Sequence, residues 1–526
     1  MGRLSLGKRP DAKFIFLALA AFYAVLFVGR WAWLRAARSV RLSAAKAEYR
    51  HDEFVQIRLS TWDPALNRAW AKSPPEVRVT RGGRPVATIG GLRQVRMSPA
   101  GWGRWTGLWP CPWNAPAGKY DLELGTAAAV SGTKRLDTGR LESRPFSIAY
   151  RRPRLLPKGF AVMTLESDLP LDGLRVRSPD GTTKDWRGML DWVEYAGADA
   201  FWILGGRSPG AKPGEVWLGN NFPVLPKVAR ECRRRGIKFG IYVQCFLTMS
   251  GKDIIPGYEY ALDVSDGRII PTRAISLGDD RRVRDVAALL KRFSDIPGVD
   301  YVGVDYIRNA LGGMELVDEF YRDMAGVVSP PPEFAHLSRE QRMVCFARRK
   351  ALRKDLALID AWQWWRAHRV CGIIRRLKAE LGEEKLLWAF MLTWDKGWHH
   401  GQDPVMFNDA GVDVEALMLY EADAAQYGAL LSDWSRYVRR SDAQLIVGDV
   451  VDWPLHQRHP DGPKEFYRRT VRAIDGIYAD GPARGLFVHD LGRALWGRLG
   501  PWGTRGWLDE ARAAIRHLKR EAGISR

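Results

Sequence analysis

The chain has 526 residues, of which 46% are hydrophobic and 27% are charged, a composition typical of a globular protein with one large and one smaller domain. The formal net charge of +21 favours anionic partners such as lipid headgroups or acidic polymers, but the arginines are spread without a long basic block, which argues against a nucleic-acid partner. The five cysteines show neither a CxxC pattern nor metal-ligand spacing, which indicates free buried thiols rather than a disulfide framework.

The first 48 residues contain an uncharged apolar run from Phe14 to Gly29, which follows several basic residues and precedes Arg30 and the sequence WAWL. The run is slightly short for a bilayer. With Arg30 reaching the interface and the tryptophans beside it, we expect a membrane anchor over about residues 14–34, a cytoplasmic basic tip before it and a linker after it. A signal peptide cleaved near residues 42–47 is the alternative.

Residues 50–152 are predicted to form a β-sandwich, because short alternating runs such as FVQIRLS, EVRVTRGG and GKYDLELG are broken by Gly and Pro. The stretch GRWTGLWPCPWNAPAGKYDLEL resembles the edge of bacterial immunoglobulin-like modules that precede polysaccharide-active domains. Tryptophans in and beside it either pack the interior or stack on sugar rings. They are Trp102, Trp105, Trp109 and Trp113.

Residues 155–522 alternate apolar, β-rich runs with amphipathic helical stretches eight times. The predicted strands begin at Gly159, Asp199, Lys238, Tyr301, Lys385, Val414, Ala443 and Gly485. Continuous apolar strands between helices indicate a parallel sheet covered by helices, and eight units predict a (β/α)8 TIM barrel, an α/β fold. An open doubly wound sheet is the competing fold. It would favour a glycine-rich turn after the first strand, where this sequence reads ESDLPLDGL.

Polar side chains follow most of these strands, and in such barrels the C-terminal strand ends carry the active site. They are Glu166, Asp168, Arg207, Gln244, Asp305, Arg308, Trp394, Asp395, Glu421, Asp423, Asp449, Asp452, His489 and Asp490. One such carboxylate could simply cap the following helix. Carboxylates after most strands predict an acidic mouth in an otherwise basic protein.

An acidic mouth with aromatic side chains suits glycoside cleavage, which needs two carboxyl groups on either side of the scissile bond. Aromatic rings and hydrogen-bonding groups for sugars occur in the loops after strands five and seven. They are Trp394, Trp398, His399 and Trp453. We therefore expect these residues to bind substrate together with Glu166, Asp168, Arg207, Gln244, Arg308, Asp449, His489 and Asp490.

The large domain resembles the glycoside-hydrolase type of barrel, and in particular bacterial glycosyl-hydrolase-like barrels whose fourth strand ends in an apolar run followed by D-Y-x-R. Here that sequence is VGVDYIR, and WWRAHRVCGIIRRLK and ALMLYEAD also resemble this group. The resemblance implies Asp305 as nucleophile and Glu421 as acid/base, with Asp395 as its substitute. Arg308 is expected to lower the pKa of Asp305 and keep it ionised. The structural alternatives are an ion pair between Asp305 and Arg308 and a helix-capping role for Glu421.

Together these features predict a membrane-anchored, exported, retaining glycoside hydrolase or transglycosidase that acts on an envelope or extracellular polysaccharide. We expect it in the bacterial inner membrane with its body in the periplasm or outside; secretion is the alternative. A non-catalytic glycan-binding barrel of an envelope polysaccharide assembly is the second hypothesis. The third is a metal-dependent polysaccharide deacetylase. No cofactor or metal is expected, because no His-x-His or HExxH spacing occurs.

Overall fold

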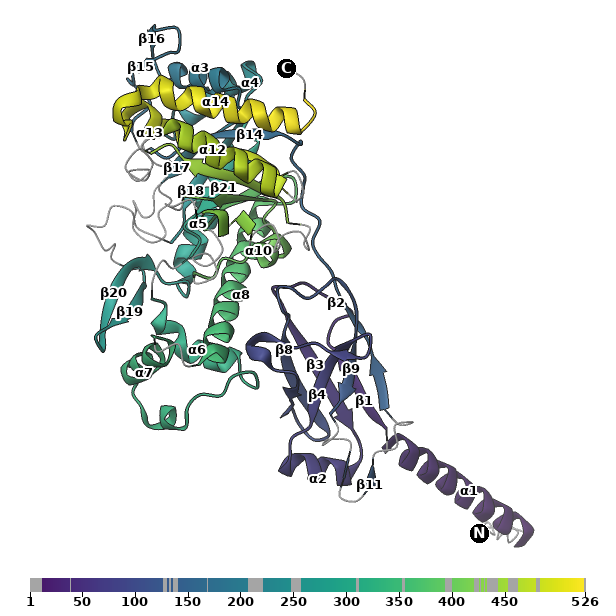
Figure 1. The fold of residues 1–526 in the computed structure, drawn as a ribbon. Helices are drawn as coiled ribbons and strands as arrows, with labels where there is room; N and C mark the ends of the chain where they lie inside the picture. The colour runs from purple at the N-terminus through teal and green to yellow at the C-terminus, as the bar shows by residue number, and fades with distance from the viewer. Residues whose placement is uncertain are drawn as a thin grey trace, which may run out of the picture.

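The computed structural model describes most of the chain. The described residues are 12–37, 39–125, 130–131, 134–135, 141–167, 169–206, 221–246, 257–308, 312–351, 355–392, 400–420, 425, 427–429, 431–432, 443–452, 462–478 and 483–524. Helix α1 extends from one end of a β-sandwich, and a parallel barrel covered by helices lies beyond the sandwich (Figure 1). The expected α/β fold with an eight-stranded barrel is therefore confirmed.

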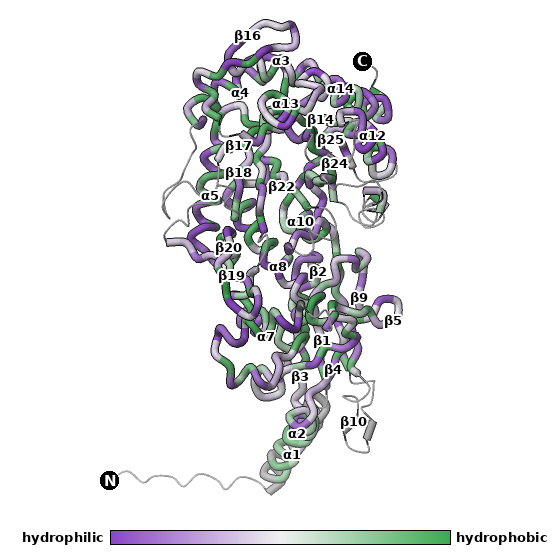
Figure 2. The backbone as a smooth tube through the Cα atoms, turned by 60° about the vertical axis from the view of Figure 1, so that its left-hand side comes forward, coloured by the Kyte–Doolittle hydropathy of each residue, from purple (hydrophilic) through white to green (hydrophobic). Residues whose placement is uncertain are grey.

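Helix α1 spans Ala12–Ala37 and exposes large apolar side chains, among them Phe16 at 74% and Phe27 at 71% of their surface. Its hydrophobic character is visible as the green helix near the foot of Figure 2. Across the parts of the chain that the structure describes, no helix combines the length and apolarity that crossing a membrane requires. The expected transmembrane anchor is not confirmed.

Two antiparallel-rich sheets form the sandwich. The first contains, in order, β12 (Leu141–Arg144), β1 (Val40–Ala44), β3 (Phe54–Thr61), β8 (Arg104–Pro110) and β7 (Ser98–Pro99). The second contains β2 (Glu48–Tyr49), β13 (Phe146–Ile148), β9 (Gly118–Leu124), β4 (Glu76–Arg81) and β5 (Arg84–Pro85), with β6 (Val95–Arg96) also paired to β4. Helix α2 (Pro64–Lys72) is capped by Asp63, and β10 (Val130–Ser131) and β11 (Lys134–Arg135) form a separate pair.

Alternation along the sandwich strands explains its core. In β3 the side chains of Val55, Ile57 and Leu59 are buried while their neighbours face outward, as the two-residue period of a strand requires. Trp105 and Trp109 are 5% and 2% exposed and belong to this core, whereas Trp102 is 63% exposed. Most of the surface of Trp105 and Trp109 is thus occupied by packing and not open to sugar.

The eight predicted barrel strands are confirmed, and they close into a ring in chain order. They are β14 (Phe160–Leu165), β17 (Ala200–Gly206), β18 (Lys238–Gln244), β21 (Tyr301–Asp305), β22 (Leu386–Leu392), β23 (Val414–Met418), β24 (Leu445–Val450) and β25 (Ala483–His489). All neighbours pair in parallel, and β25 closes the ring against β14. Their carboxyl ends therefore meet at one mouth.

The barrel interior is filled by aromatic rings, so it is a packed core and not a pore. Trp202 and Trp388 stack with ring centroids 4.1 Å apart. Glycines on neighbouring strands make room for them: a Cβ at Gly240 would lie 2.4 Å from the ring of Trp202, and one at Gly303 would lie 2.1 Å from the ring of Trp388. These glycines are required by close approach and not by a turn.

Helices surround the barrel and carry the connections. They are α3 (Arg187–Ala196), α4 (Leu225–Arg234), α5 (Asp280–Ser294), α6 (Val317–Asp323), α7 (Arg339–Ala351), α8 (Leu356–Leu381), α10 (Pro404–Ala410), α12 (Pro463–Ala473), α13 (Leu491–Trp496) and α14 (Gly503–Glu521). Two hairpins, β15–β16 (Val176–Arg177 with Thr183–Lys184) and β19–β20 (Tyr260–Ser265 with Arg268–Ile275), extend from the connections. Single turns occur at Ile89–Gly91, Met314–Leu316, Pro332–His336, Ile474–Tyr478 and Gly500–Trp502.

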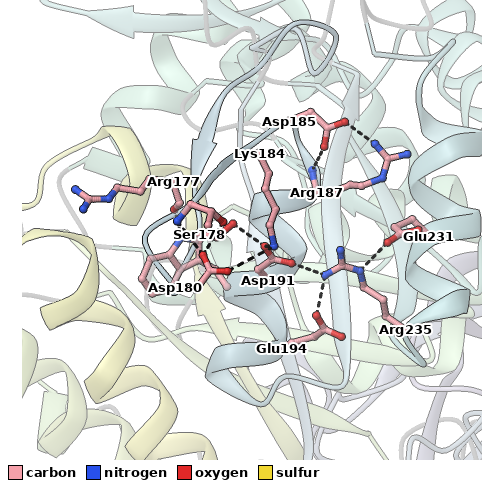
Figure 3. Close-up of polar contacts among 12 residues, drawn as sticks. Arg177, Ser178, Asp180, Lys184, Asp185, Arg187, Asp191, Glu194, Glu231 and Arg235 are labelled. Atoms are coloured by element: carbon pink, nitrogen blue, oxygen red, sulfur yellow. Dashed lines mark hydrogen bonds and ion pairs between the residues drawn. The ribbon is translucent and has the colours of Figure 1, made fainter.

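A polar cluster holds α3, α4 and the β15–β16 hairpin together (Figure 3). Arg235 donates to Asp191 at 2.8 Å, to Glu194 at 2.7 Å and to Glu231 at 2.8 Å. Asp191 also accepts from the Lys184 ammonium at 2.7 Å. Arg235 lies just before β18, at the amino end of that strand, so this network is at the end of the barrel opposite the mouth. Residues at that end are expected to stabilise the fold.

Buried hydrogen bonds join the sandwich to the barrel helices. His51 contacts Asp409, next to the end of α10, through Nδ1 at 2.7 Å and the Ala115 carbonyl through Nε2 at 2.7 Å. Trp364 on α8 donates its indole N–H to the Cys111 carbonyl at 2.8 Å. These contacts hold α8 and α10 against the sandwich. Cys111 and three further cysteines are free and buried, as the sequence predicted; Cys345 is only partly buried.

Candidate active site

Strand register brings four polar side chains from different strands to the barrel mouth. Gln244 and Asp305 are paired across β18 and β21, and both are the last residues of their strands. His489 ends β25, and Glu166 follows β14, the neighbour of β25 in the ring. The four lie on two pairs of adjoining strands, β25 with β14 and β18 with β21, and only β17 separates the two pairs, so the structure gathers them on one side of the mouth.

Glu166 is surrounded by hydrogen-bond donors. Its Oε1 accepts from Gln244 Nε2 at 3.3 Å, and its Oε2 contacts His489 Nε2 at 3.1 Å. The Arg493 guanidinium lies 3.7 Å from the same Oε2. Donors on both oxygens favour the ionised form of a carboxyl group. The geometry therefore holds Glu166 as a carboxylate.

His489 is arranged as a cation facing Glu166. Its Nδ1 lies 3.1 Å from Thr164 Oγ1, while that hydroxyl lies 3.1 Å from the Val488 carbonyl, to which it donates. Since the single hydroxyl proton is used there, Nδ1 carries its own proton, and Nε2 donates to Glu166. Burial lowers the pKa of His489, but the hydrogen bond to Glu166 and the carboxylates of Asp490 and Glu166 raise it to above its ordinary value.

Asp305 is 6% exposed, and its Oδ1 accepts the Tyr306 backbone N–H at 2.7 Å. Burial and the neighbouring Glu166 carboxylate raise the pKa of Asp305 to about 7, despite opposing effects of Arg308, the Tyr306 N–H and His489. The expectation that Arg308 keeps Asp305 ionised is therefore wrong. Arg308 acts in the expected direction, but desolvation and Glu166 outweigh it.

Arg308 does not form the hydrogen-bonded pair with Asp305 that the sequence suggested. Tyr306 has a positive φ of 49°, and the Arg308 guanidinium lies over the Tyr306 ring at 4.6 Å. Arg308 is 6% exposed, and its Nε and Nη1 have no hydrogen-bond partner among the described residues. Burial lowers the pKa of Arg308, and Asp305 and Tyr306 only partly offset this effect.

Three further acids of the mouth that the structure describes are matched to arginines. Asp449 pairs with Arg469 at 2.9 Å. Asp452 contacts Arg493 and also Arg498, the latter at 3.1 Å. Asp490 caps α13 by accepting the Arg493 backbone N–H at 2.8 Å. These contacts favour structural roles for the three acids.

Several predicted site residues lie outside the described residues, so the structure gives no distance from Asp305 to Glu421 or Asp395. They are Asp168, Arg207, Trp394, Asp395, Trp398, His399, Glu421, Asp423 and Trp453. The structure adds three residues that sequence reasoning missed: Thr164, Tyr420 and Arg493. Thr164 is two residues before Glu166, so the strand period offered a signal for it. Tyr420 stacks on His489 with centroids 5.3 Å apart, a contact that only the fold creates.

Glu166, His489 and Asp490 offer ligand atoms within 4.8 Å of one another, so they are the set of described residues that could hold a metal ion. A metal needs a free imidazole nitrogen and unprotonated ligands. Both nitrogens of His489 are engaged as donors, toward Thr164 and Glu166. The arrangement fits an ion pair better than a metal centre.

Comparison with solved structures finds carbohydrate-active barrels. The glycoside hydrolase domain of PgaB (BpsB) from Bordetella bronchiseptica shares 11% identity over 64% of this chain and 94% of that domain, with a TM-score of 0.44. A β-galactosidase from the Antarctic haloarchaeon Halorubrum lacusprofundi shares 13% identity over 70% of this chain and 58% of its own, also with a TM-score of 0.44. The catalytic domain of a family GH18 chitinase from the fern Peteris ryukyuensis shares 10% identity over 68% of this chain and 99% of its own, with a TM-score of 0.35.

No protein-family model matches the sequence, and no curated protein matches it either. Because the structural likenesses are this distant, the assignment of an activity rests on the site itself.

Proposed function

We propose that the protein is a glycoside hydrolase in which Asp305 and Glu166 form the catalytic carboxyl pair. The observation that carries this proposal is that the two carboxyl groups differ in protonation. Glu166 is held as a carboxylate by Gln244, His489 and Arg493, while Asp305 has a pKa of about 7. Two carboxyl groups with different protonation are what cleavage of a glycosidic bond requires.

In this reaction Asp305 donates a proton to the leaving oxygen, and Glu166 acts on the anomeric carbon. Asp305 thus has the acid role that the sequence resemblance implied for Glu421, and Glu166 has the nucleophile role implied for Asp305. The retaining mechanism remains part of the proposal, with Glu166 forming the glycosyl-enzyme bond. Proton NMR of the first anomer released tests this: the substrate's own configuration supports retention, and the opposite one makes Glu166 a base for water.

The test is a glycan hydrolysis screen of the full chain, comparing wild type with Asp305→Asn and Glu166→Gln. Each substitution removes one carboxyl group and nearly preserves shape, and each is expected to lower the rate by at least 10²-fold. Asp295→Asn is the matched control, because this exposed aspartate follows α5 at the end of the barrel opposite the mouth and pairs with Lys291 of the same helix. Activity that survives both active-site substitutions refutes the assignment.

The second hypothesis, glycan binding without cleavage, predicts binding by wild type and no product at any pH. The cluster of Glu166, His489 and Asp490 is the reason to test the metal-dependent deacetylase as a further candidate, although both nitrogens of His489 are engaged. Elemental analysis of the purified protein distinguishes the deacetylase from the glycoside hydrolase. A bound divalent ion whose removal abolishes release of acetate supports the deacetylase and argues against the carboxyl-pair mechanism.

We also propose that α1 holds the protein at an envelope membrane, with the remainder exported and acting on an envelope or extracellular polysaccharide. The exposed apolar side chains of α1, including Phe22 and Leu26, support this proposal. Fractionation of cells that produce the full chain or a chain lacking residues 1–37 tests it. Equal recovery of both in the fraction without membranes contradicts the proposal.

A further inference from the structure

The arginines of the barrel mouth differ in whether a carboxylate pairs with them. Arg469 pairs with Asp449, and Arg493 and Arg498 both contact Asp452. Arg308 alone in this group has no carboxylate at ion-pair distance among the described residues, and its Nε and Nη1 have no hydrogen-bond partner there. It is also more than nine-tenths buried. Two buried guanidinium nitrogens without an acceptor are costly and need a reason.

The local fold fixes this arginine in place. Tyr306 has a left-handed backbone conformation, and two residues later the Arg308 guanidinium packs on the Tyr306 ring. Tyr306 responds electrostatically to Asp305, Glu166 and Arg493, which places its ring among the groups of the mouth. Arg308 is therefore a pre-positioned donor beside Asp305, held by stacking and without an ion pair to any described carboxylate.

Charge at neutral pH strengthens the need for an external anion. Asp305 is the nearest acid to Arg308 along the chain, and it is only partly ionised near pH 7. The guanidinium is then incompletely neutralised within the described mouth. A guanidinium matches a carboxylate in charge and in the geometry of its donors. The net charge of +21 also favours the approach of a polyanion.

We propose that Arg308 forms a subsite for a sugar carboxylate on the ring bound beside Asp305, so that the substrate is an acidic, uronate-containing glycan. This inference rests on the proposed glycosidase function for its biological meaning, but it concerns binding and is tested by binding. The hydroxyl groups of a neutral sugar would satisfy the donors of Arg308 without balancing its charge.

The experiment measures binding of uronate oligosaccharides to the full-length protein by calorimetry at pH 6, where Asp305 is mostly protonated. The same oligosaccharides after chemical reduction of their carboxyl groups provide the neutral comparison, and a sulfated neutral glycan provides a second anion. Wild type is expected to bind the uronate form at least 10-fold more tightly than the reduced form. Arg308→Gln is expected to lose about 10- to 100-fold in affinity for the uronate form and little for the reduced one.

Arg308→Lys retains the charge and is expected to recover part of the lost affinity, and it also serves if Arg308→Gln does not fold. Arg516→Gln is the matched control, because this exposed arginine on α14 lines a cleft with Gly197 and Ile237 at the opposite end of the barrel. Its affinities are expected to equal those of wild type.

An equal loss for the uronate and reduced forms overturns the inference, because Arg308 would then act on the site in general. Stronger binding of the sulfated glycan than of the uronates also overturns it. Uronate binding that depends on Arg308 without any hydrolysis supports the subsite while refuting the glycosidase. Hydrolysis of neutral glycans, together with a uronate affinity that Arg308→Gln does not change, supports the glycosidase while refuting the subsite.

Discussion

The protonation of Asp305 can be perturbed in opposite directions by its two charged neighbours. Removal of the Glu166 negative charge in Glu166→Gln lowers the pKa of Asp305, because Glu166 raises it. Removal of the Arg308 positive charge in Arg308→Gln raises the pKa of Asp305, because Arg308 lowers it. His489 also faces this group and lowers its pKa, so it is left unchanged in both variants.

The size of the effect follows from the wild-type value. The pKa of Asp305 rises from 3.8 to about 7. At this pKa the group is about 90% protonated at pH 6, about half at pH 7 and about 10% at pH 8. A proton donor with this titration makes kcat/KM fall about tenfold per pH unit above 7. Each variant removes one charge that acts on Asp305, so each should move the midpoint by roughly one unit.

The assay is pH-difference infrared spectroscopy, which needs no activity and therefore suits Glu166→Gln. The protonated carboxyl band that disappears in Asp305→Asn reports Asp305. Its midpoint should lie near 7 in wild type, lower in Glu166→Gln and higher in Arg308→Gln, and the alkaline limb of kcat/KM should move with it in Arg308→Gln. A wild-type midpoint near 4, or a shift of both variants in the same direction, refutes the assignment of Asp305 as the proton donor.

Three further predictions concern other parts of the barrel. Thr164→Val removes the acceptor of the His489 Nδ1–H and should lower the pKa of His489, measured by NMR of its ring; an unchanged titration contradicts the imidazolium assignment. Gly303→Ala places a methyl group against the Trp388 ring and should destabilise by about 1–3 kcal/mol in thermal unfolding, whereas Gly372→Ala, with open space inside α8, should stabilise by up to about 1 kcal/mol. Burial and the carboxylates of Asp403 and Asp409 raise the pKa of Glu415 well above 4.5, so the folded state loses stability as pH rises above about 4.5. Glu415→Gln should remove this penalty, with a gain near zero at pH 4 and about 1–3 kcal/mol at pH 7; an equal gain at both pH values contradicts the mechanism.

The barrel could be predicted from the sequence because its signal is local. Each strand is a continuous apolar run followed by a polar residue, as in the segment from Tyr301 to Asp305, and a strand's carboxyl end has a fixed place in such a barrel. The positions of Glu166, Gln244, Asp305 and His489 at strand ends follow from the same pattern. Because eight strand–helix units close into one barrel, these strand ends meet at the same mouth.

The chemistry of the site could not be predicted in the same way, because it depends on distant neighbours. Arg308 is close to Asp305 in sequence and suggested an ionised pair, but the turn at Tyr306 directs the guanidinium onto an aromatic ring. The group that sets the protonation of Asp305 is Glu166, which lies far away in the chain. The ion pair of Glu166 with His489 joins residues from opposite ends of the barrel sequence.

These contacts also resolve the contrast between an acidic mouth and a basic protein. Asp449 and Asp452 are neutralised by arginines, and Glu166 is balanced by His489. Asp305 holds its proton about half of the time at pH 7. Among the described residues of the mouth, the carboxylates leave the Arg308 guanidinium unbalanced, three residues beyond Asp305. A mouth that is acidic by sequence can therefore accept an anionic sugar, provided that the carboxylate of the sugar reaches Arg308 while Asp305 remains protonated.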